Sequence, residues 1–447
     1  MIGRRMGDPI LQNDIKYWPF TVIEHNGVPQ IDIRGKPHPP ERVSATLLAS
    51  LKAEAEKYLG GIKVTKAVIT VPAYFDDGQR AATVDAGEMA GLEVLTILNE
   101  PTAAAIAYKM EQFSDTPRKV LVYDLGGGTF DVAVLQTGAK TIDVLGVDGD
   151  THLGGEDFDK NVMEECVKQF REQTGINLLQ DKDSQVKPKK EQCRRILRRL
   201  QTYSERAKRH LSSALQASIV VDQIVPEKDL HVVITRAKFE ELNQVLFKKT
   251  IDVVDKALKD ANVSKDKIDD ILLVGGSTRI PKIREMLSQH FNGKALSHSV
   301  HPDIAVAYGA AVQAALLNGA KGESLFDFES IRDVTPMALG VEAKIGHVSG
   351  RFSIIIPKNT KIPHKAVEKY YTTYNNQPSV EINVYQGENP VAKKNNFLGT
   401  FDLDGIPPNR AGAESLDVTM EIDKMGILHV TARIQLIQLQ CKRKKDD

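Results

Sequence analysis

The hydrophobic periodicity of the chain changes once, near residue 325, and this change constrains the fold more than any other feature. Before it, from about residue 40, short apolar runs alternate with helical patterns, as in 64–110 and 271–291. After it, apolar and polar residues alternate between turn signals such as NQP, DGIPP and DKMG. We therefore predict an α/β part with a largely buried sheet, followed by an all-β module of short antiparallel strands that form a sandwich.

The stretch VLVYDLGGGTFDVAVL at 120–135 places three glycines between two apolar runs. FDVAVL alternates with period two, so the stretch predicts a β-hairpin and not the strand–helix turn of a dinucleotide fingerprint. The sequence also contains no GxxxxGK[ST] phosphate loop. The backbone N–H groups of 126–129 can surround an anion, and Asp124 can hold a hydrated Mg²⁺. A plain tight hairpin explains the three glycines equally well.

Two further stretches are candidates for a nucleoside site. In LLVGGSTRIPKI, Gly275 and Gly276 end a predicted strand, and Ser277 is expected to cap the next helix. In SERAKRHLSSA, polar residues at i, i+3, i+4 and i+7 from Glu205 share a helix face that can hydrogen-bond a ribose and stack on a base. Taken alone, the first stretch is as typical of a plain turn, and the second is more typical of a solvated charged helix face.

Other patterns predict buried helices and exclude some classes of protein. EDFDKNVMEECVKQF predicts a helix whose buried face is Phe158, Val162, Met163, Cys166 and Phe170. The apolar stretch 304–317 is too short to span a bilayer and predicts a buried helix. Lys+Arg and Asp+Glu both number 59, which argues against a general nucleic-acid binder. The three cysteines lack metal-ligand spacing, and the N-terminus lacks the apolar region of a signal peptide, so we expect an intracellular protein without a membrane partner.

Together these stretches resemble the seventy-kilodalton heat-shock protein chaperones, in particular their cytosolic branch. The resemblance extends over most of 1–433 through VPAYFDDGQRAAT, LNEPTAAAIAY, DTHLGGEDFD, VHPDIAVAYGAAVQAALL, NTKIP, NNQPSVEINVYQGE, LGTFDLDGIPP and MGILHVTA. It implies an α/β actin-like (ribonuclease H-like) nucleotide-binding domain at 1–322, a linker at 323–334, an all-β peptide-binding sandwich at 335–433 and a divergent basic tail at 434–447. In this family ATP binding opens the sandwich and hydrolysis closes it on an extended apolar peptide.

The resemblance also assigns residues around ATP or ADP and Mg²⁺. Asp124 would hold the metal through water, Glu100 would order the attacking water, and Asp131 would support the same site. Phosphate contacts fall on Gly126, Gly127, Gly128 and Thr129, of which Thr129 is also counted as catalytic. Adenosine contacts fall on Glu205, Lys208, Arg209 and Ser212 from one side, and on Gly275, Gly276, Ser277, Arg279 and Asp303 from the other.

Further roles are implied between the domains and in the sandwich. Pro72 and Arg80 match positions that relay the nucleotide state. Tyr371 and Tyr374 match a strand that arches over the peptide. The apolar peptide pocket falls on Val380 and Ile382, with Val341 nearby, although ordinary sandwich core explains these residues without the resemblance.

Three departures from the family pattern lead to expectations. Family members carry a second glycine-rich hairpin and a lysine before a segment resembling MIGRR, so the first domain is expected to be incomplete and hydrolysis very weak, because one lost transition-state donor costs about 10²–10³ in rate. ESIR at 329–332 replaces a run of leucines, so apolar docking of the linker is expected to be weaker. The ending 433–447 diverges, so the last sandwich strands and the helical lid are expected to be missing.

Three hypotheses about function follow. The first is an ATP-dependent chaperone with unfolded or extended apolar polypeptides, J-domain co-chaperones and nucleotide-exchange factors as partners, in the cytoplasm and also the nucleus. The second is a regulatory or decoy protein that binds nucleotide without hydrolysing it. The third is an incomplete gene product without a folded role. A sugar kinase shares the actin-like superfamily, but the β module argues against it.

Overall fold

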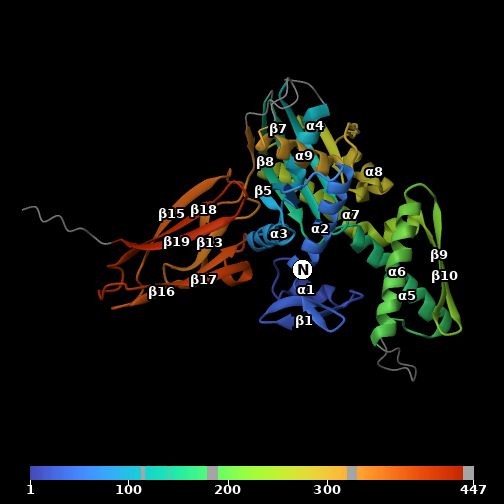
Figure 1. Cartoon of the computed structure of the whole chain (residues 1–447), viewed down its shortest axis with the longest axis horizontal. Coiled ribbons are helices and arrows are strands. Elements are labelled where there is room, and N and C mark those ends of the chain that lie inside the picture. The colour runs from blue at the N-terminus through green and yellow to red at the C-terminus, as the bar shows by residue number, and fades with distance from the viewer. Residues whose placement is uncertain (112–115, 139, 179–189, 298, 320–329, 436–447) are drawn as a thin grey trace, which may run out of the picture. The chain divides into compact units, whose positions relative to one another are not determined.

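The computed structural model describes residues 1–111, 116–138, 140–178, 190–297, 299–319 and 330–435 (Figure 1). The chain divides into two compact units, Met1–Pro336 and Met337–Asp447. The helices of the first unit are α1 (Pro9–Asp14), α2 (Pro40–Tyr58), α3 (Asp77–Met89), α4 (Glu100–Glu111), α5 (Gly155–Thr174), α6 (Lys190–Leu211), α7 (Arg236–Asp260), α8 (Pro281–His290) and α9 (Ala305–Leu317).

The strands of the first unit form four sheets. An antiparallel sheet contains β1 (Thr21–His25), β2 (Val28–Ile33) and β3 (Lys36–His38), and a parallel pair contains β4 (Lys66–Val71) and β5 (Glu93–Asn99). The five-stranded central sheet has the order β11 (Asp270–Val274), β6 (Arg118–Leu125), β7 (Phe130–Thr137), β8 (Thr141–Asp150) and β12 (Ser330–Arg332). A separate hairpin contains β9 (Gln216–Val225) and β10 (Lys228–Thr235).

The central sheet confirms the predicted glycine hairpin. β6 and β7 are antiparallel, and Asp124 lies opposite Asp131 in their register. Alternate residues of β6 enter different cores: Leu121 and Tyr123 belong to one apolar cluster and Val122 to the other. Both faces of this sheet are therefore covered, as the apolar strands predicted.

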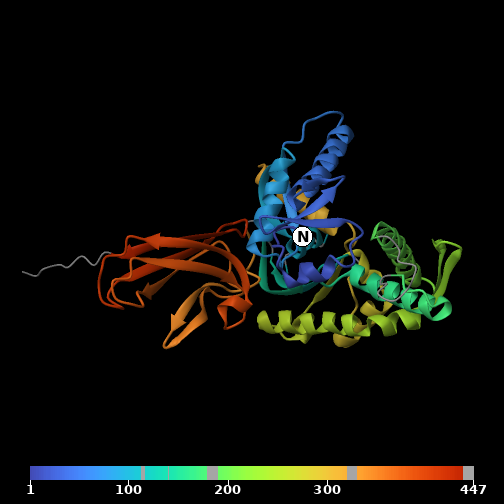
Figure 2. The ribbon, with the colours of Figure 1, turned by 90° about the horizontal axis from the view of Figure 1, so that it is seen from below.

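The helices that cover the sheet follow their predicted patterns with one exception. All five predicted core residues of α5 are at most 1% exposed, and α7 runs as one long helix in Figure 2. The helix predicted at 304–317 is α9, but the prediction that it is buried is wrong on one side, because Tyr308 is 43% exposed. Its other side approaches α4 so closely that a Cβ on Gly309 would meet the Ala103 carbonyl oxygen at 1.8 Å.

The second unit contains two antiparallel sheets and a short 3-10 turn (Ala392–Lys394). One sheet has the order β14 (Val348–Ile356), β13 (Leu339–Ile345), β16 (Ser379–Gln386) and β17 (Asn396–Asp404), and the other has β15 (His364–Tyr371), β18 (Ser415–Ile422) and β19 (Leu428–Gln435). Side chains of both sheets, among them Val384 and Val418, form one apolar core. This is the sandwich-like arrangement that the alternating pattern favours.

The segment before the second unit joins the central sheet. Ser330–Arg332 pairs in parallel with Thr141–Asp143, and the Arg332 guanidinium holds the Asp143 carboxylate through two nitrogens at 2.6 and 2.8 Å. The earlier part of the predicted linker, 323–329, lies outside the described residues, as does the predicted tail from 436 onward. Across the described ranges, no helix combines the length and apolar character needed to cross a membrane.

Candidate functional site

The glycine turn between β6 and β7 lies at the centre of the candidate site. Its backbone closes through a hydrogen bond from the Gly126 N–H to the Thr129 carbonyl oxygen at 3.1 Å. A Cβ placed on Gly127 or Gly128 would have no neighbour within 4 Å, so both residues face open space. Gly128 and Glu205 line the same cavity, which has a volume of about 620 Å³.

Gly155, at the start of α5, joins the separate parts of this site. Its N–H donates to the Gly126 carbonyl oxygen at 3.0 Å, and its own carbonyl oxygen accepts from Lys208 Nζ at 2.8 Å. A Cβ here would approach Ser277 Oγ to 2.7 Å and Lys208 Nζ to 2.8 Å, so these side chains pack closely on Gly155 and would have to shift for any other residue. The motif-based assignment omitted Gly155, although the GG of DTHLGGEDFD before a helix was a usable signal.

Lys208 is the best anchored residue of the predicted adenosine face. Its Nζ lies 2.8 Å from Asp159 Oδ2, and both side chains are 11% exposed. Burial raises the pKa of Asp159 to about 6 even though Lys208 opposes the shift. Asp159 is thus a second residue that sequence reasoning missed, and it fixes the position of the Lys208 ammonium group.

The remaining predicted adenosine residues lie nearer to solvent. Arg209 and Glu205 form an exposed i,i+4 pair at 3.7 Å. Ser212 follows the end of α6, and its Oγ lies 3.5 Å from the Lys208 carbonyl oxygen. These side chains can reorient around a ligand at low cost, since exposed ion pairs contribute little to stability.

The opposite group of adenosine residues follows β11. Gly275 has φ +82°, and a Cβ there would come within 2.3 Å of the Leu125 carbonyl oxygen. Gly276 is exposed and lies beside Asp303, whose Oδ2 pairs with Arg279 Nη2 at 2.5 Å. The bare backbone predicted at this turn therefore lies next to the glycine hairpin.

The predicted capping role of Ser277 is wrong. α8 starts at Pro281, and no side chain caps its first turn. Ser277 Oγ instead donates to the Gly126 carbonyl oxygen at 2.8 Å, because a 3-10 turn at Gly276–Arg279 separates it from the helix. This hydrogen bond ties the turn after β11 to the glycine hairpin.

Three buried carboxyl groups gather beside the hairpin. Burial raises the pKa of Glu100 to about 7. Burial and the neighbouring Glu100 raise the pKa of Asp131 to about 8, although Asp131 Oδ1 accepts a hydrogen bond from the Tyr74 N–H at 3.1 Å. Burial, Glu100 and Asp131 together raise the pKa of Asp124 well above its ordinary value. All three shifts favour the protonated carboxyl groups, and a bound cation would oppose them.

This cluster fits a hydrated magnesium ion better than a directly ligated one. Within the ranges that the structure describes, no set of three or more His, Cys, Asp or Glu side chains is arranged to ligate a metal directly. Mg²⁺ commonly keeps several waters and uses one or two carboxylates together with phosphate oxygens. Asp124, which is 7% exposed at the end of β6, suits that role.

Arg80 connects the carboxyl cluster to the segment that precedes the second unit. Arg80 is 5% exposed, and its guanidinium donates to Asn99 Oδ1 at 2.6 Å and to the Ala73 carbonyl oxygen at 3.1 Å. Thr102 Oγ1 donates to Asp333 Oδ2 at 2.7 Å in the same region. Pro72, the other predicted relay residue, is buried directly before Ala73. Asn99, Thr102 and Asp333 were not predicted, because their partners are distant in sequence.

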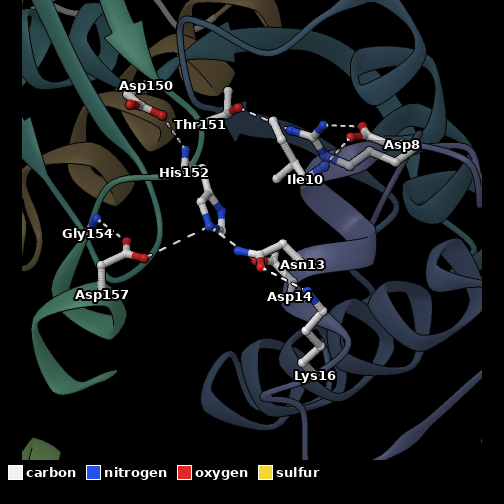
Figure 3. A network of polar contacts seen from close by, with 11 residues as sticks. Asp8, Ile10, Asn13, Asp14, Lys16, Asp150, Thr151, His152, Gly154 and Asp157 are labelled. Carbon is white, nitrogen blue, oxygen red and sulfur yellow. Dashed lines mark hydrogen bonds and ion pairs between the residues drawn. The ribbon is translucent and has the colours of Figure 1, made fainter. Parts of the chain in front are cut away.

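The N-terminal segment is tied to the loop before α5, as Figure 3 shows. His152 Nε2 lies 3.1 Å from Asp14 Oδ1 and 3.9 Å from Asp157 Oδ1. Arg4 donates to Thr151 Oγ1 at 3.1 Å and pairs with Asp8 at 2.5 Å. These contacts position α1 beside the loop that carries Gly155.

In the second unit, the predicted peptide residues divide into two groups. Val341 and Ile382 are 3% and 4% exposed and belong to the apolar core, and Val380 packs against that core. Tyr371 and Tyr374 are 56% and 53% exposed at the end of β15 and in the following loop. The tyrosines are therefore free to contact a ligand, whereas Val341 and Ile382 support the strands beneath.

Comparison with known proteins agrees with the sequence motifs. The Hsp70 protein family matches residues 1–443. The heat shock 70 kDa protein of Neurospora crassa is 47% identical over 436 residues, which make up 97% of this chain and 65% of that protein. Two ribosome-associated molecular chaperones, from Eremothecium gossypii and Candida glabrata, are 47% and 46% identical over 437 residues, 97% of this chain and 68% of each relative. The chain thus spans about two thirds of the length of these curated relatives, and it belongs to the Hsp70 protein family.

Proposed function

We propose that this chain is an ATP-dependent chaperone that binds extended apolar peptides in its β-sandwich under the control of a nucleotide in its first unit. The observation that carries the nucleotide part is the meeting of the glycine turn, Lys208 and Ser277 at Gly155. We also propose the domain bounds 1–322, 323–334 and 335–433, which the division after Pro336 supports.

The proposed nucleotide lies along the cavity that Gly128 and Glu205 line. Phosphate oxygens would accept from the N–H groups of the Gly126–Thr129 turn, where the missing side chains leave room for an anion. Lys208 and Arg209 would hold the adenosine from α6, and the Gly275–Arg279 turn with Asp303 would hold it from the other side. When bound, Mg²⁺ supplies the positive charge that lets Asp124 and its neighbouring carboxyl groups ionise. Glu100, with a pKa of about 7, is suited to orienting a water and accepting its proton.

The alternative is a nucleotide-binding regulatory protein that does not hydrolyse ATP. This alternative requires Glu100, Asp131 and Asp124 to keep their protons when nucleotide binds, and burial raises the pKa of all three. Single-turnover hydrolysis of ATP with and without Mg²⁺ separates the two. Hydrolysis that depends on Mg²⁺ and on Glu100 supports the chaperone cycle, whereas tight binding without turnover supports the regulatory protein.

Gly128→Ala tests the proposed phosphate contact without disturbing the fold. The added methyl group meets nothing within 4 Å in the unliganded protein, so unfolding should be unchanged. ADP affinity should fall about tenfold while adenosine affinity is retained. Gly399→Ala on β17 is the matched control, since it too has open space. Equal ADP affinity in both variants would contradict the phosphate contact.

The peptide part rests on the exposed tyrosines. Tyr371→Ser and Tyr374→Ser together should weaken binding of a labelled extended apolar peptide about tenfold, measured by fluorescence anisotropy. Val367→Ser, 54% exposed on the same strand β15, is the control and should bind normally. As further parts of this proposal, J-domain co-chaperones and nucleotide-exchange factors are the protein partners, and the cytoplasm is the compartment.

A further inference from the structure

A groove lies between α6 and β9. It is on a different face of α6 from Lys208, which belongs to the proposed nucleotide site. It has a volume of about 1040 Å³, and its lining includes Tyr203, Arg206, His210, Ala214, Leu215 and Ser218. At 100° per residue, Tyr203 and His210 point away from Lys208 on α6. We propose that this groove binds an acidic amphipathic segment of a partner polypeptide, a role that goes beyond the proposed chaperone cycle.

The rim of the groove presents apolar surface. Leu215, which links α6 to β9, is 75% exposed. Ser218 lines the groove, and its ladder partner Val233 is 46% exposed; Val220, two residues along β9, is 43% exposed. The apolar surface at Leu215 therefore continues along the exposed face of the β9–β10 hairpin. Figure 1 shows this hairpin standing beside α6.

The groove carries one formal positive charge, on Arg206, and His210 adds a basic side chain. Both residues are exposed, and the described lining residues include no carboxylate. The Arg206 guanidinium carbon lies 5.5 Å from the centre of the Tyr203 ring, a cation–π contact that orients the group. Within the described ranges neither residue pairs with an acid, whereas Arg209 on the neighbouring face pairs with Glu205.

These features select one class of occupant. An apolar side chain can cover Leu215 while carboxylates reach Arg206 and His210, which is the arrangement of an acidic amphipathic helix in a groove. A small anion would leave the apolar rim uncovered. A nucleic acid would need a row of cations along its phosphates, and Arg206 is the only Lys or Arg among the described residues that line this groove.

A labelled synthetic peptide tests the proposal on the full chain. The probe has leucine at helical spacing on one face and glutamate elsewhere, and the control peptide has lysine in place of glutamate. Fluorescence anisotropy should show binding of the acidic peptide alone, weakening as NaCl rises from about 50 to about 300 mM. Arg206→Glu with His210→Glu should lower the affinity at least tenfold, and Leu215→Ser about threefold.

Matched variants separate this site from others. Val245→Ser on α7, where Val245 is 81% exposed, and Arg410→Glu in the second unit should leave binding unchanged. Equal binding of both peptides, or loss of binding in Tyr371→Ser/Tyr374→Ser but not in the groove variants, would overturn the proposal. So would a groove that binds a labelled RNA oligonucleotide but not the acidic peptide, or that self-associates through Leu215 in sedimentation velocity.

Discussion

The central sheet and the β4–β5 pair arise from the same strand–helix pattern, yet their burial differs. Every residue of 120–125 except Asp124 is 0% exposed, and apolar clusters cover both faces. In β4, by contrast, most residues are only half buried, and α2, which packs against α3, exposes Leu47 and Leu51 by 63% and 58%. Figure 2 shows α2 at the edge of the first unit.

This difference separates a well-covered from a less covered part of the site. The glycine turn, Gly155 and Ser277 are anchored on the closed central sheet. Arg80 belongs to α3, next to the open β4–β5 pair, whereas Glu100 begins α4, which contacts β5 but packs mainly against α9 and the central sheet. Apolar burial is the main stabilising term, so the two parts should respond differently to the same kind of substitution.

The largest expected effect tests that difference in packing directly. Phe158→Ala removes a fully buried ring that packs edge-to-face on Phe247 and should lower the free energy of unfolding by about 3–5 kcal/mol. Leu47→Ala on α2 should change it by less than about 0.5 kcal/mol. Urea unfolding measures both. Similar losses of unfolding free energy in the two variants would contradict the difference, because they would mean that Leu47 of α2 is buried in solution.

The next effect concerns the anchor of the adenosine side. Lys208→Met leaves the Asp159 carboxyl buried without its cation and should cost about 3 kcal/mol, along with adenosine affinity. Adding Asp159→Asn should restore most of the stability but not the affinity. Thermal unfolding and calorimetric titration follow the two quantities. Recovery of affinity in the double variant would show that Lys208 does not contact the ligand.

A comparable effect is expected at Glu100, where the open and closed parts meet. Its pKa is about 7 when folded against an ordinary 4.5, so the folded protein keeps a proton that the unfolded chain loses. Stability of the unliganded protein should therefore fall as pH rises from about 4.5 to about 7. Glu100→Gln should reduce this dependence, which Asp131, Asp124 and Asp159 also produce, and add roughly 3 kcal/mol at pH 8. If the pH profile of Glu100→Gln equals that of the unsubstituted protein, the Glu100 carboxyl is exposed to water and its pKa is not raised.

The smallest effect concerns the edge strand β12. Arg332→Leu removes a half-exposed ion pair with Asp143 and should cost less than about 1 kcal/mol at low salt, and less still at high salt. Hydrogen exchange of the Ser330–Arg332 amides should nevertheless quicken. Exchange that does not change would show that the backbone ladder alone holds this segment.

The sequence predicted the elements of the site more reliably than their contacts. The hairpin at 120–135, the buried face of α5 and the strand–turn–helix at 271–291 follow from local periodicity, and the structure has all three. The predictions failed where the contact of a side chain depends on a residue far away in the sequence. Ser277 meets Gly126 across 151 residues, and Thr102 meets Asp333 across 231.

The sequence by itself determined the class of the protein: an α/β part and an all-β part, a glycine hairpin that cannot be a dinucleotide loop, and membership of the chaperone family. These depend on neighbours along the chain and on motifs preserved as strings of residues. Only the tertiary structure decided that Gly155 joins the site, that three carboxyl groups share one buried region, and that α2 exposes its leucines. Burial and hydrogen bonding depend on which segments meet in space, and local periodicity does not determine these long-range contacts.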